Sequence, residues 1–516
     1  MIPLTLGALR EAAGAVLHDA DGVVAELGSP AYAALTRLVV AGPVVTDSRV
    51  CGPGGLYVAR VGEHADGHVY VDAAAERGAI AALTERPVPG LPCLVVADCQ
   101  SAFGALARAV LDAALVHQPG LTVVGVTGSS GKTSTKDLLA QVLGAPGGPG
   151  PTIAPVESLN GEIGVPLTVC RITADTRVLV AEMGSRGIGH LSYLTRIAPP
   201  RIAVVLNVGT AHVGEFGGRE QIAIAKRELV EALPPAGGDR GGVAVLNADD
   251  PAVRAMAAHT AARVVLVGES PDAQVRASDV QLDDAGRPSL RVHTPVGEAH
   301  LTLGLHGRHH VGNALAALAV ALACGMPLDA AVAALAAARP VSRWRMEVTQ
   351  RADAITVVND AYNANPDSMA AALRALHAMG RPTTPLSSTE TSGTEAPTRR
   401  TWAVLGAMLE LGEDSEAEHR GVGALAAELG IDRVLAVGPG AAAIADGARA
   451  AGCPAEAVLR AGDADAAYRL LVRDTRPGDV VLFKSSRDSG LRWLGERFAV
   501  VGTGDGPDDA RGGTAT

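Results

Sequence analysis

Short apolar runs alternate with longer amphipathic or alanine-rich stretches along most of this chain. Runs of Val, Leu, Ile and Ala without charges are typical of strands buried on both faces, and the stretches between them have helical periodicity. This alternation predicts an α/β fold built on parallel sheets. Clear examples of the apolar runs are Val123–Val126, Val178–Ala181, Ile202–Leu206, Val243–Leu246 and Val480–Phe483.

The run that begins at Val123 leads into a glycine-rich turn, and a helical pattern follows at Lys136–Leu143. Strand, glycine-rich loop and helix in this order are typical of a phosphate-binding loop. Glycines let backbone N–H groups surround phosphate oxygens, and the helix N-terminus adds partial positive charge. The residues predicted to bind nucleotide phosphates are Gly125, Gly128, Ser129, Ser130, Gly131, Lys132, Thr133 and Ser134.

Lys132 is predicted to neutralise the terminal phosphates, and the hydroxyl of Thr133 to ligate Mg²⁺. The loop is a variant, Gly-x-x-Gly-x-x-Gly-Lys-Thr, because Val126 stands where the usual motif has glycine. The alternative is an ordinary glycine-rich turn. The strand before it and the helix after it favour the phosphate loop.

Polar residues close two further strands of the same region. Glu182 ends a buried strand, where doubly wound sheets place functional groups, so it is a candidate metal ligand; the alternative is a helix cap. His212 follows the next strand and is a candidate for metal or phosphate, or a structural histidine. Lys226 lies within a helical pattern and, from the residues alone, is interpreted as a surface lysine.

Residues 1–118 predict a small α/β domain with strands near Leu38–Val40, Leu56–Val58 and Leu94–Val96 and a helix over Tyr70–Leu83. A second helix is expected over Ala102–Val116. The turn Asp47-Ser48-Arg49 can present a hydroxyl and a guanidinium to a phosphate or uracil, although such a sequence is also an ordinary turn.

The remaining chain predicts two larger α/β domains, residues 119–340 and 341–502. Short alternation at 275–305 indicates an antiparallel addition to the first of them. Residues 383–400 are of low complexity and are expected to form a flexible surface insertion, and the tail 503–516 is expected to be disordered.

Composition narrows the range of functions. A formal net charge of −11 argues against bulk nucleic-acid binding, and the six cysteines form no Cys-x-x-Cys pair. No basic, apolar signal pattern follows Met1. The longest uncharged run, Val311–Leu328, contains polar and glycine residues and indicates a buried helix and turn rather than a membrane span. We therefore expect a soluble, cytoplasmic protein with reduced thiols.

One candidate for nucleotide recognition lies beyond the phosphate loop. Asn313, at the start of an Ala/Leu helix, can offer its amide to an adenine edge, or it can serve helix capping or turn chemistry. No Gly-x-Gly-x-x-Gly fingerprint follows the strands of the C-terminal unit, so a nicotinamide cofactor is disfavoured.

Taken together, these motifs resemble the Mur ligases, and the resemblance runs from about residue 40 to 495. It is carried by the order of the segments: the loop Gly125–Thr133, Glu182, Asn207–His212, Ala225-Lys226, Asn247–Asp249, Gly307–Asn313, Arg345–Glu347, Asn359–Pro366 and Lys484–Arg487. Within the family, Asn359–Met369, Gly62–Tyr70 and Ile163–Pro166 are most similar to the branch that adds D-alanyl-D-alanine.

The resemblance implies an ATP- and Mg²⁺-dependent ligase. ATP would phosphorylate the terminal carboxylate of UDP-N-acetylmuramoyl-tripeptide (UDP-MurNAc-tripeptide). The amine of D-Ala-D-Ala would then attack the acyl phosphate. A monomer with a P-loop central domain and a Rossmann-like C-terminal domain is also implied. Neither diaminopimelate nor lysine is favoured as the third residue of the acceptor peptide.

The resemblance also implies roles for single residues. Thr133, Glu182 and His212 would hold metal, and Lys226 would do so as a carbamate, with Lys132, Lys226 and His212 forming the catalytic set. Asn313, Arg345 and Asp360 would contact the nucleotide. The residues expected to meet the UDP-peptide or the dipeptide are Asp47, Ser48, Arg49, Asn160, Tyr362, Asn363 and Asn365.

Three alternatives remain at this point. A related ligase would add a single amino acid to a UDP-MurNAc-peptide. A P-loop ATPase of the switch or motor type would hydrolyse ATP without acceptor or amine. A non-catalytic partner would retain only the fold, which the intact Lys132, Thr133, Glu182 and Lys226 argue against.

Overall fold

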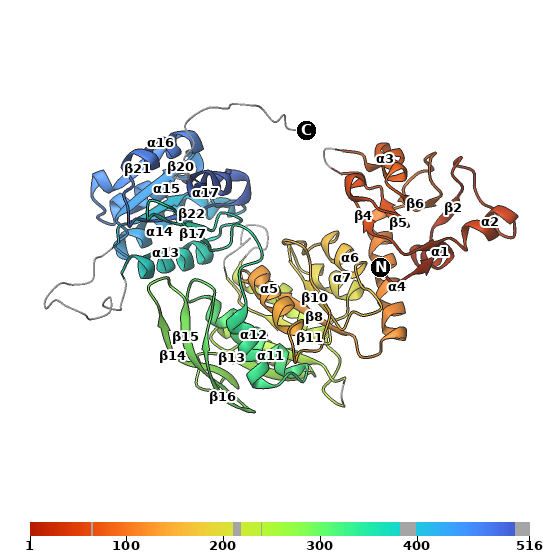
Figure 1. Cartoon of the computed structure of the whole chain (residues 1–516), viewed down its shortest axis with the longest axis horizontal. Coiled ribbons are helices and arrows are strands. Elements are labelled where there is room, and N and C mark those ends of the chain that lie inside the picture. Colours follow the sequence, from red (N-terminus) through yellow and green to blue (C-terminus); the bar gives the residue numbers. More distant parts are fainter. Residues whose placement is uncertain (63–64, 210–217, 239, 382–398, 501–516) are drawn as a thin grey trace.

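The chain forms an α/β structure with three larger sheets that follow one another in sequence (Figure 1). The structure is a computed structural model, and it describes residues 1–62, 65–209, 218–238, 240–381 and 399–500. The α/β class predicted from the alternation of strands and helices is confirmed. The predicted flexible insertion 383–400 and the tail 503–516 lie almost entirely outside the described residues.

The N-terminal sheet has five strands in the order β2-β7-β6-β5-β4, and a short pair, β1-β3, lies beside it. The expected helix over residues 70–83 is wrong in its second half. The helix α3 ends at Glu76, and Gly78, with φ of 97°, turns the chain into the buried strand β6. The elements are β1 Leu4–Thr5, α1 Leu6–Ala13, β2 Val16–His18, α2 Pro30–Leu35, β3 Val39–Val40, β4 Val44–Val45, β5 Gly55–Val58, α3 Val71–Glu76, β6 Ala79–Thr84, β7 Cys93–Val95 and α4 Cys99–His117.

The central sheet has nine strands in the order β16-β15-β14-β13-β12-β11-β8-β10-β9. Strands β9 to β14 and β8 pair in parallel, whereas β14, β15 and β16 pair antiparallel, which confirms the predicted addition at 275–305. The strands are β8 Thr122–Thr127, β9 Thr152–Ile153, β10 Val178–Glu182, β11 Ile202–Val205, β12 Val243–Asn247, β13 Arg263–Gly268, β14 Val275–Leu282, β15 Pro288–Thr294 and β16 Gly297–Thr302.

Side chains of β8 alternate between two hydrophobic cores, one on each face of the central sheet. Val123 packs into a core that continues through α4 into the N-terminal unit, and Val124 and Val126 pack into the other. Helices on both faces therefore explain the continuous apolar strands. The helices are α5 Lys132–Leu143, α6 Gly164–Val169, α7 His190–Ile197, α9 Arg219–Glu231, α10 Pro251–Ala255, α11 His310–Ala323 and α12 Leu328–Ala337.

The C-terminal sheet has six strands in the order β17-β18-β22-β19-β20-β21, all parallel except the edge strand β17. This confirms the parallel sheet predicted there. Helix α13 begins beside the central unit and runs along this sheet (Figure 1). The elements are β17 Glu347–Gln350, β18 Thr356–Asn359, α13 Pro366–Gly380, β19 Thr401–Leu405, α14 Ser415–Glu428, β20 Arg433–Val437, α15 Ala442–Ala450, β21 Val458–Ala461, α16 Ala464–Asp474, β22 Val480–Lys484 and α17 Leu491–Val500.

Within the described residues, only α4 has the length and hydropathy of a membrane-spanning helix. Half of its apolar window is buried inside the protein, where it packs on α1, α6 and α7. The same apolar character is expected of a core helix. The run Val311–Leu328, interpreted from sequence as a buried helix and turn, falls on α11 and the turn after it, and α11 is buried on nearly every side.

Candidate functional site

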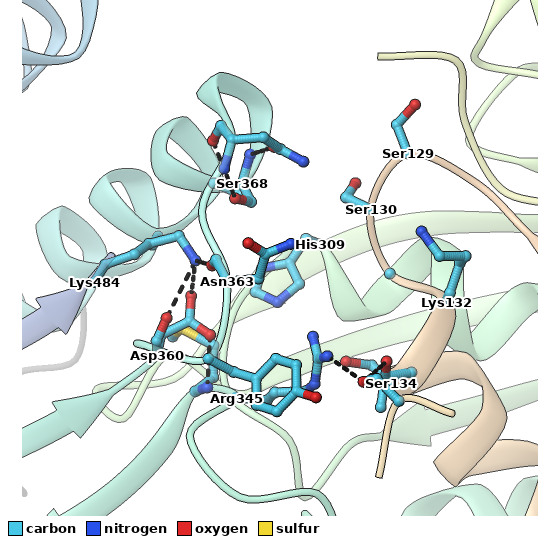
Figure 2. Close-up of a pocket in the computed structure, with 18 of the residues that line it drawn as sticks. Ser129, Ser130, Lys132, Ser134, His309, Arg345, Asp360, Asn363, Ser368 and Lys484 are labelled. Atoms are coloured by element: carbon cyan, nitrogen blue, oxygen red, sulfur yellow. Dashed lines mark hydrogen bonds and ion pairs between the residues drawn. The ribbon is translucent and has the colours of Figure 1, made fainter. Parts of the chain in front are cut away.

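A polar cleft of about 410 Å³ separates the glycine-rich loop of the central unit from the start of the C-terminal unit (Figure 2). Segments that are far apart along the chain meet there, as expected where parallel strands end. The residues lining it that matter below are Ser129, Ser130, Gly131, Lys132, Thr133, Ser134, Ser158, Asn160, Glu182, Asn207, His309, Asn313, Arg345, Asp360, Tyr362, Asn363, Asn365, Ser368, Glu410, Lys484, Ser486, Arg487 and Asp488.

The loop between β8 and α5 needs glycine at two positions. Gly131 has φ of 79°, and a Cβ there would lie 2.7 Å from Oδ1 of Asn313. A Cβ on Gly128 would lie 3.0 Å from the Cβ of Leu206. Asn313 therefore packs directly on the loop. Gly125, in contrast, is inside β8 and does not line the cleft; it lets α9 approach the sheet, because a Cβ there would meet Leu229 at 2.9 Å.

Asn207, just beyond the neighbouring strand β11, holds the loop in shape. Its Oδ1 accepts the N–H of Ser130 at 2.9 Å, and its Nδ2 donates to the carbonyl of Ser130 at 3.2 Å. The hydroxyl of Ser129 accepts the N–H of Gly209 at 2.9 Å. A single amide side chain thus pairs both main-chain groups of a loop residue 77 positions away.

Lys132 lies in the curve of the loop, and its Nζ donates to the carbonyl of Gly128 at 2.6 Å. Burial lowers the pKa of Lys132, nearby Glu182 opposes that shift, and nearby Arg345 adds to it. An enclosed cation with only a main-chain partner is suited to bind anionic oxygens.

Oxygen side chains gather around Thr133. Its Oγ1 lies 3.2 Å from Oε1 of Glu182 and 2.8 Å from Oγ of Ser158, and Nδ2 of Asn160 donates to the same Glu182 oxygen at 2.8 Å. The other oxygen of Glu182, Oε2, is buried without a hydrogen-bond partner. Glu182 is 1% exposed. A carboxylate with an unused oxygen beside two hydroxyls fits a hard cation such as Mg²⁺.

Within the described ranges, no three His, Cys, Asp or Glu residues form a metal-binding group. The fit for a cation therefore rests on the hydroxyls and on the unpartnered oxygen of Glu182. His212, predicted to hold metal or phosphate, lies outside the described residues.

Lys226 is buried in α9, with 4% of its surface exposed, so the interpretation as a surface lysine is wrong. The helical pattern around it is real, but Lys226 is on the inward side with Ile222 and Leu229. Burial, followed by repulsion from Lys132, lowers the pKa of Lys226 to about 7. Near neutral pH a large fraction of this amine is uncharged and nucleophilic.

The C-terminal side of the cleft is organised around Asp360, which follows β18. Its Oδ2 accepts a hydrogen bond from Nζ of the buried Lys484 at 2.6 Å, and its Oδ1 accepts the N–H of Met346 at 3.0 Å. Lys484 also donates to the carbonyl of Asn363 at 3.1 Å. Asn365 caps α13, exchanging hydrogen bonds with Ser368.

Arg345 connects the two sides of the cleft. Its Nη2 donates to Oγ of Ser158 at 2.6 Å, and its guanidinium lies 4.3 Å from the centre of the Tyr362 ring. The residues on either side, Trp344 and Met346, have φ of 59° and 49°. Two non-glycine residues in the left-handed region store backbone strain around Arg345, as is common at functional sites.

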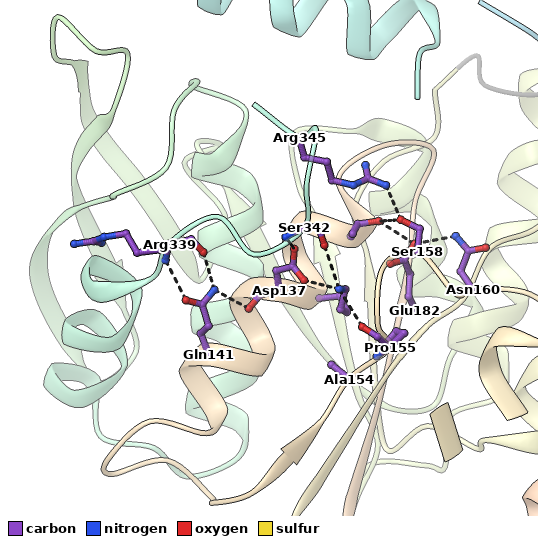
Figure 3. Close-up of polar contacts among 12 residues, drawn as sticks. Asp137, Gln141, Ala154, Pro155, Ser158, Asn160, Glu182, Arg339, Ser342 and Arg345 are labelled. Carbon is purple, nitrogen blue, oxygen red and sulfur yellow. Dashed lines mark hydrogen bonds and ion pairs between the residues drawn. The ribbon is translucent and has the colours of Figure 1, made fainter. Parts of the chain in front are cut away.

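The segment that leads to Arg345 is held by the helix of the phosphate loop (Figure 3). Gln141 of α5 accepts the N–H of Arg339 at 3.0 Å and donates to its carbonyl at 3.0 Å. Asp137, which forms a buried ion pair with Lys136, accepts the N–H of Ser342 at 3.2 Å. The main chain between the two units is thus bound to α5 at two successive points.

The turn Asp47-Ser48-Arg49 lies in the N-terminal unit and lines no part of this cleft. Asp47 pairs with Arg49 at 2.9 Å, and both side chains are substantially exposed. The hydrogen bonds from Arg49 lower the pKa of Asp47. The structure therefore separates this candidate from the other predicted site residues.

Comparison with known proteins accounts for both sides of the cleft. Residues 126–321 match the Mur ligase middle domain, and residues 344–487 match the domain described as Mur ligase, glutamate ligase domain. UDP-N-acetylmuramoyl-tripeptide–D-alanyl-D-alanine ligase of Mycobacterium tuberculosis is 46% identical over 95% of this chain and 96% of its own length. The chain belongs to the Mur ligase family.

Solved structures of Mur ligases have the same fold. A crystal structure of MurF from Acinetobacter baumannii superimposes with a TM-score of 0.79, at 30% identity, over 96% of this chain and 99% of that one. MurF of Thermotoga maritima in complex with ADP gives a TM-score of 0.73, at 28% identity, over 89% of this chain and 97% of that one.

Several cleft residues of this Mur ligase were not predicted from its sequence. The sequence marks Asn207 only as the start of a motif, and it predicts no role for Ser158, His309 or Ser368. One signal was present for Asn207: it follows the strand next to the loop. Arg487 was noted only as the end of the segment Lys484–Arg487, without a function.

Proposed function

We propose that this Mur ligase joins D-alanyl-D-alanine to UDP-MurNAc-tripeptide, forming UDP-MurNAc-pentapeptide, ADP and phosphate. The observation that carries the proposal is a phosphate loop facing a second α/β unit across a polar cleft, in a chain 46% identical to an enzyme of that name over almost its whole length. The reaction supplies a peptidoglycan precursor.

The chemistry needs a carboxylate to become an electrophile. Phosphorylation by ATP provides the leaving group, but triphosphate and carboxylate repel each other. The cation of Lys132 and the loop N–H groups offset this repulsion and stabilise the transferring phosphoryl group. Bound Mg²⁺ would supply further positive charge there, held by Oγ1 of Thr133 and the unpartnered Oε2 of Glu182.

The nucleotide would lie between the two units. Asn313 abuts Gly131, and Arg345 reaches Ser158 beside Thr133. Asp360, held by Lys484 and the N–H of Met346, is rigid enough to bind a ribose hydroxyl. These positions support the nucleotide-binding roles proposed for Asn313, Arg345 and Asp360. Closure around the nucleotide would exclude the water that hydrolyses an acyl phosphate.

The acceptor would reach this cleft from the N-terminal unit, where Asp47, Ser48 and Arg49 are proposed to bind its uridine diphosphate. Asn160 donates its amide to Glu182, so we propose that it also fixes the direction of that carboxylate. Tyr362, Asn363 and Asn365 are proposed to contact the dipeptide. The cytoplasmic location and the monomeric state stay predictions.

Lys226 is proposed to act as a carbamate. The neutral amine forms an N–C bond to carbon dioxide and releases one proton, and a pKa of about 7 provides the neutral amine at neutral pH. A carbamate would replace a buried cation by an anion close to Lys132, which would offset the burial of two lysines near each other. In ¹³C-labelled bicarbonate buffer, ¹³C NMR should show a carbamate signal that is absent from Lys226→Ala.

The reaction is tested by measuring phosphate release from ATP with the purified protein, Mg²⁺, UDP-MurNAc-tripeptide and D-Ala-D-Ala, omitting each substrate in turn. Release that requires both the nucleotide-peptide and the dipeptide is expected. Release indifferent to both would overturn the ligase and favour a switch-type ATPase. Single amino acids offered in place of the dipeptide test the related ligases.

A further inference from the structure

Arg345 has few contacts of its own that would fix its direction in the cleft. Its Nη2 donates to Oγ of Ser158 at 2.6 Å, but its Nε is buried without a hydrogen-bond partner among the described residues. Its guanidinium also lies against the ring of Tyr362, a contact that involves no directional hydrogen bond. A long side chain of this kind keeps one direction only if the main chain that carries it is held by its surroundings.

The main chain on both sides of Arg345 is in the left-handed region. Trp344 has φ of 59° and Met346 has φ of 49°, conformations that cost free energy for residues with a Cβ. The N–H of Met346 donates to Asp360, which lines the cleft, at 3.0 Å. On the other side, a return of Trp344 to negative φ would turn the chain that follows it and redirect Arg345.

Trp344 is held through three polar groups by residues of the C-terminal unit. Its main-chain N–H donates to Oε2 of Glu347 at 3.0 Å, and its carbonyl accepts the N–H of Tyr362 at 3.2 Å. Its indole N–H donates to Oε1 of Glu496 at 2.8 Å. Glu496 belongs to α17, 152 residues further along the chain. Glu347 and Tyr362 therefore hold the main chain of Trp344, whereas Glu496 fixes the direction of its ring.

The ring of Trp344 also belongs to an aromatic cluster that reaches Arg345. It stacks on Tyr362, with 6.3 Å between ring centres and an angle of 20° between the planes. The ring of Trp493 meets it edge-on at 5.1 Å, and the guanidinium of Arg492 lies 5.1 Å from its centre. Because Tyr362 contacts both Trp344 and Arg345, a rotation of the indole would disturb both neighbours.

We propose that Glu496 is a positioning residue for the nucleotide site. By binding the indole of Trp344, it keeps the strained main chain in place and directs Arg345 toward the nucleotide. The inference rests on the nucleotide-binding role proposed for Arg345, and it extends the site to a helix that lines no part of the cleft within the described residues. The ion pair of Glu496 with Arg343 contributes less, because the Arg343 side chain is 61% exposed.

The test measures the dissociation constant of ADP by isothermal titration calorimetry with Mg²⁺ present. Glu496→Ala should weaken ADP binding by about tenfold, which is the range for the loss of one hydrogen bond to a charged group. Glu496→Gln keeps an acceptor for the indole N–H and should keep most of the affinity. Trp344→Phe keeps a ring and loses only the donor, so it should weaken ADP binding as Glu496→Ala does, and it serves as the test if Glu496→Ala does not fold.

A double-mutant cycle distinguishes positioning from a general loss of structure. If Glu496 acts through Arg345, Glu496→Ala should have no further effect on ADP binding in a chain that already carries Arg345→Ala. The KM for ATP should follow the same pattern. Arg497→Ala is the matched control, because it removes an exposed side chain of the same helix that pairs with Asp465, and it should bind ADP as wild type does.

Wild-type affinity for ADP in both Glu496→Ala and Trp344→Phe would overturn the inference. Effects of Glu496→Ala and Arg345→Ala that simply add would also overturn it, because the two residues would then act independently. Both results leave the proposed ligation intact. A wild-type protein that binds no ADP would instead overturn the nucleotide site and the proposed function, and this inference with them.

Discussion

Two polar turns of this molecule carry similar residue types and differ in how their polar groups are satisfied. In the turn at Asp47, carboxylate and guanidinium pair with each other two residues apart on an exposed surface. In the phosphate loop and the first turn of α5, the partners come from distant segments: Asn207 binds Ser130, and Glu182 reaches Thr133. Long-range partners leave some groups unused, such as Oε2 of Glu182, and those groups are free to bind a ligand.

The difference is energetic as well as geometric. A local, exposed ion pair contributes little to stability because water screens it. A loop whose shape depends on side chains far along the chain is rigid only when the whole sheet is formed, so its binding geometry and its stability are coupled. Substitutions in the two turns should therefore have very different effects.

The largest effect is expected for Lys132→Ala. It removes the cation enclosed by the loop, and kcat for substrate-dependent phosphate release should fall by about 10³-fold or more. The melting temperature should change little, since the Nζ of Lys132 bonds only to the Gly128 carbonyl. Phosphate release near the wild-type rate would show that the loop does not hold the reacting phosphates.

Lys226→Ala comes next. If the buried lysine carries a carbamate, kcat should fall by about 10²-fold, and added acetate should restore part of the activity by supplying a carboxylate. Lys132→Ala provides the control, because acetate should not rescue it. Normal activity of Lys226→Ala in bicarbonate-free buffer would end the carbamate proposal.

Asn207→Ala removes the side chain that holds the phosphate loop from a distant segment, which leaves the loop with local contacts, as in the turn at Asp47. The substitution removes two hydrogen bonds to Ser130, so the free energy of unfolding should fall by about 1–3 kcal/mol. The KM for ATP should rise about tenfold. Asn160→Ala, which keeps the loop bonds and loses the bond to Glu182, should change the Mg²⁺ requirement more than the melting temperature.

The burial of Lys226 should make the free energy of unfolding depend on pH. Folding lowers its pKa from 10.5 to about 7, so between these values the unfolded chain binds one more proton than the folded one. The free energy of unfolding should therefore rise with pH across this window. In bicarbonate-free buffer, where Lys226 keeps its free amine, the rise relative to Lys226→Met should be up to about 1.4 kcal/mol per pH unit. The free energy of unfolding is measured from urea denaturation at pH 7 and pH 9. The same change between the two pH values in wild type and in Lys226→Met would contradict the prediction.

The smallest effect is expected for Asp47→Asn, which breaks an ion pair whose two side chains are 42% and 77% exposed. Stability should change by less than about 1 kcal/mol. The KM for the UDP-linked acceptor should nevertheless rise if this turn binds the uridine diphosphate. Asp465→Asn, which breaks another exposed pair in the C-terminal unit, should leave that KM unchanged.

The sequence predicts well what neighbouring residues decide. The strand, loop and helix around Lys132, the antiparallel strands at 275–305 and the parallel C-terminal sheet all follow from local periodicity and turn residues. The same local reasoning fails at residues 79–84, where an alanine-rich run forms a strand in the middle of the N-terminal sheet. Burial on both faces outweighs helix propensity there, and the signal that marks the change is Arg77-Gly78.

What the sequence does not give are the contacts between distant segments. Taken in isolation, Lys226 is interpreted as a surface lysine, and only the packing of α9 against β8 and β11, with Lys226 among its buried residues, shows that it faces inward. The contact of Asn207 with Ser130 spans 77 residues. These contacts can be recognised only once the sheets are assembled in three dimensions.

The hydrogen bonds between α5 and the segment Arg339–Ser342 limit how the central and C-terminal units can move relative to each other. Ser342 is bonded to Asp137 of the phosphate-loop helix, and Arg345 follows only three residues later. A chain of that length spans about 11 Å at most. This short connection keeps the main chain of Arg345 close to α5 wherever the rest of the C-terminal unit lies, so the arginine proposed to contact the nucleotide stays with the helix that follows the phosphate loop.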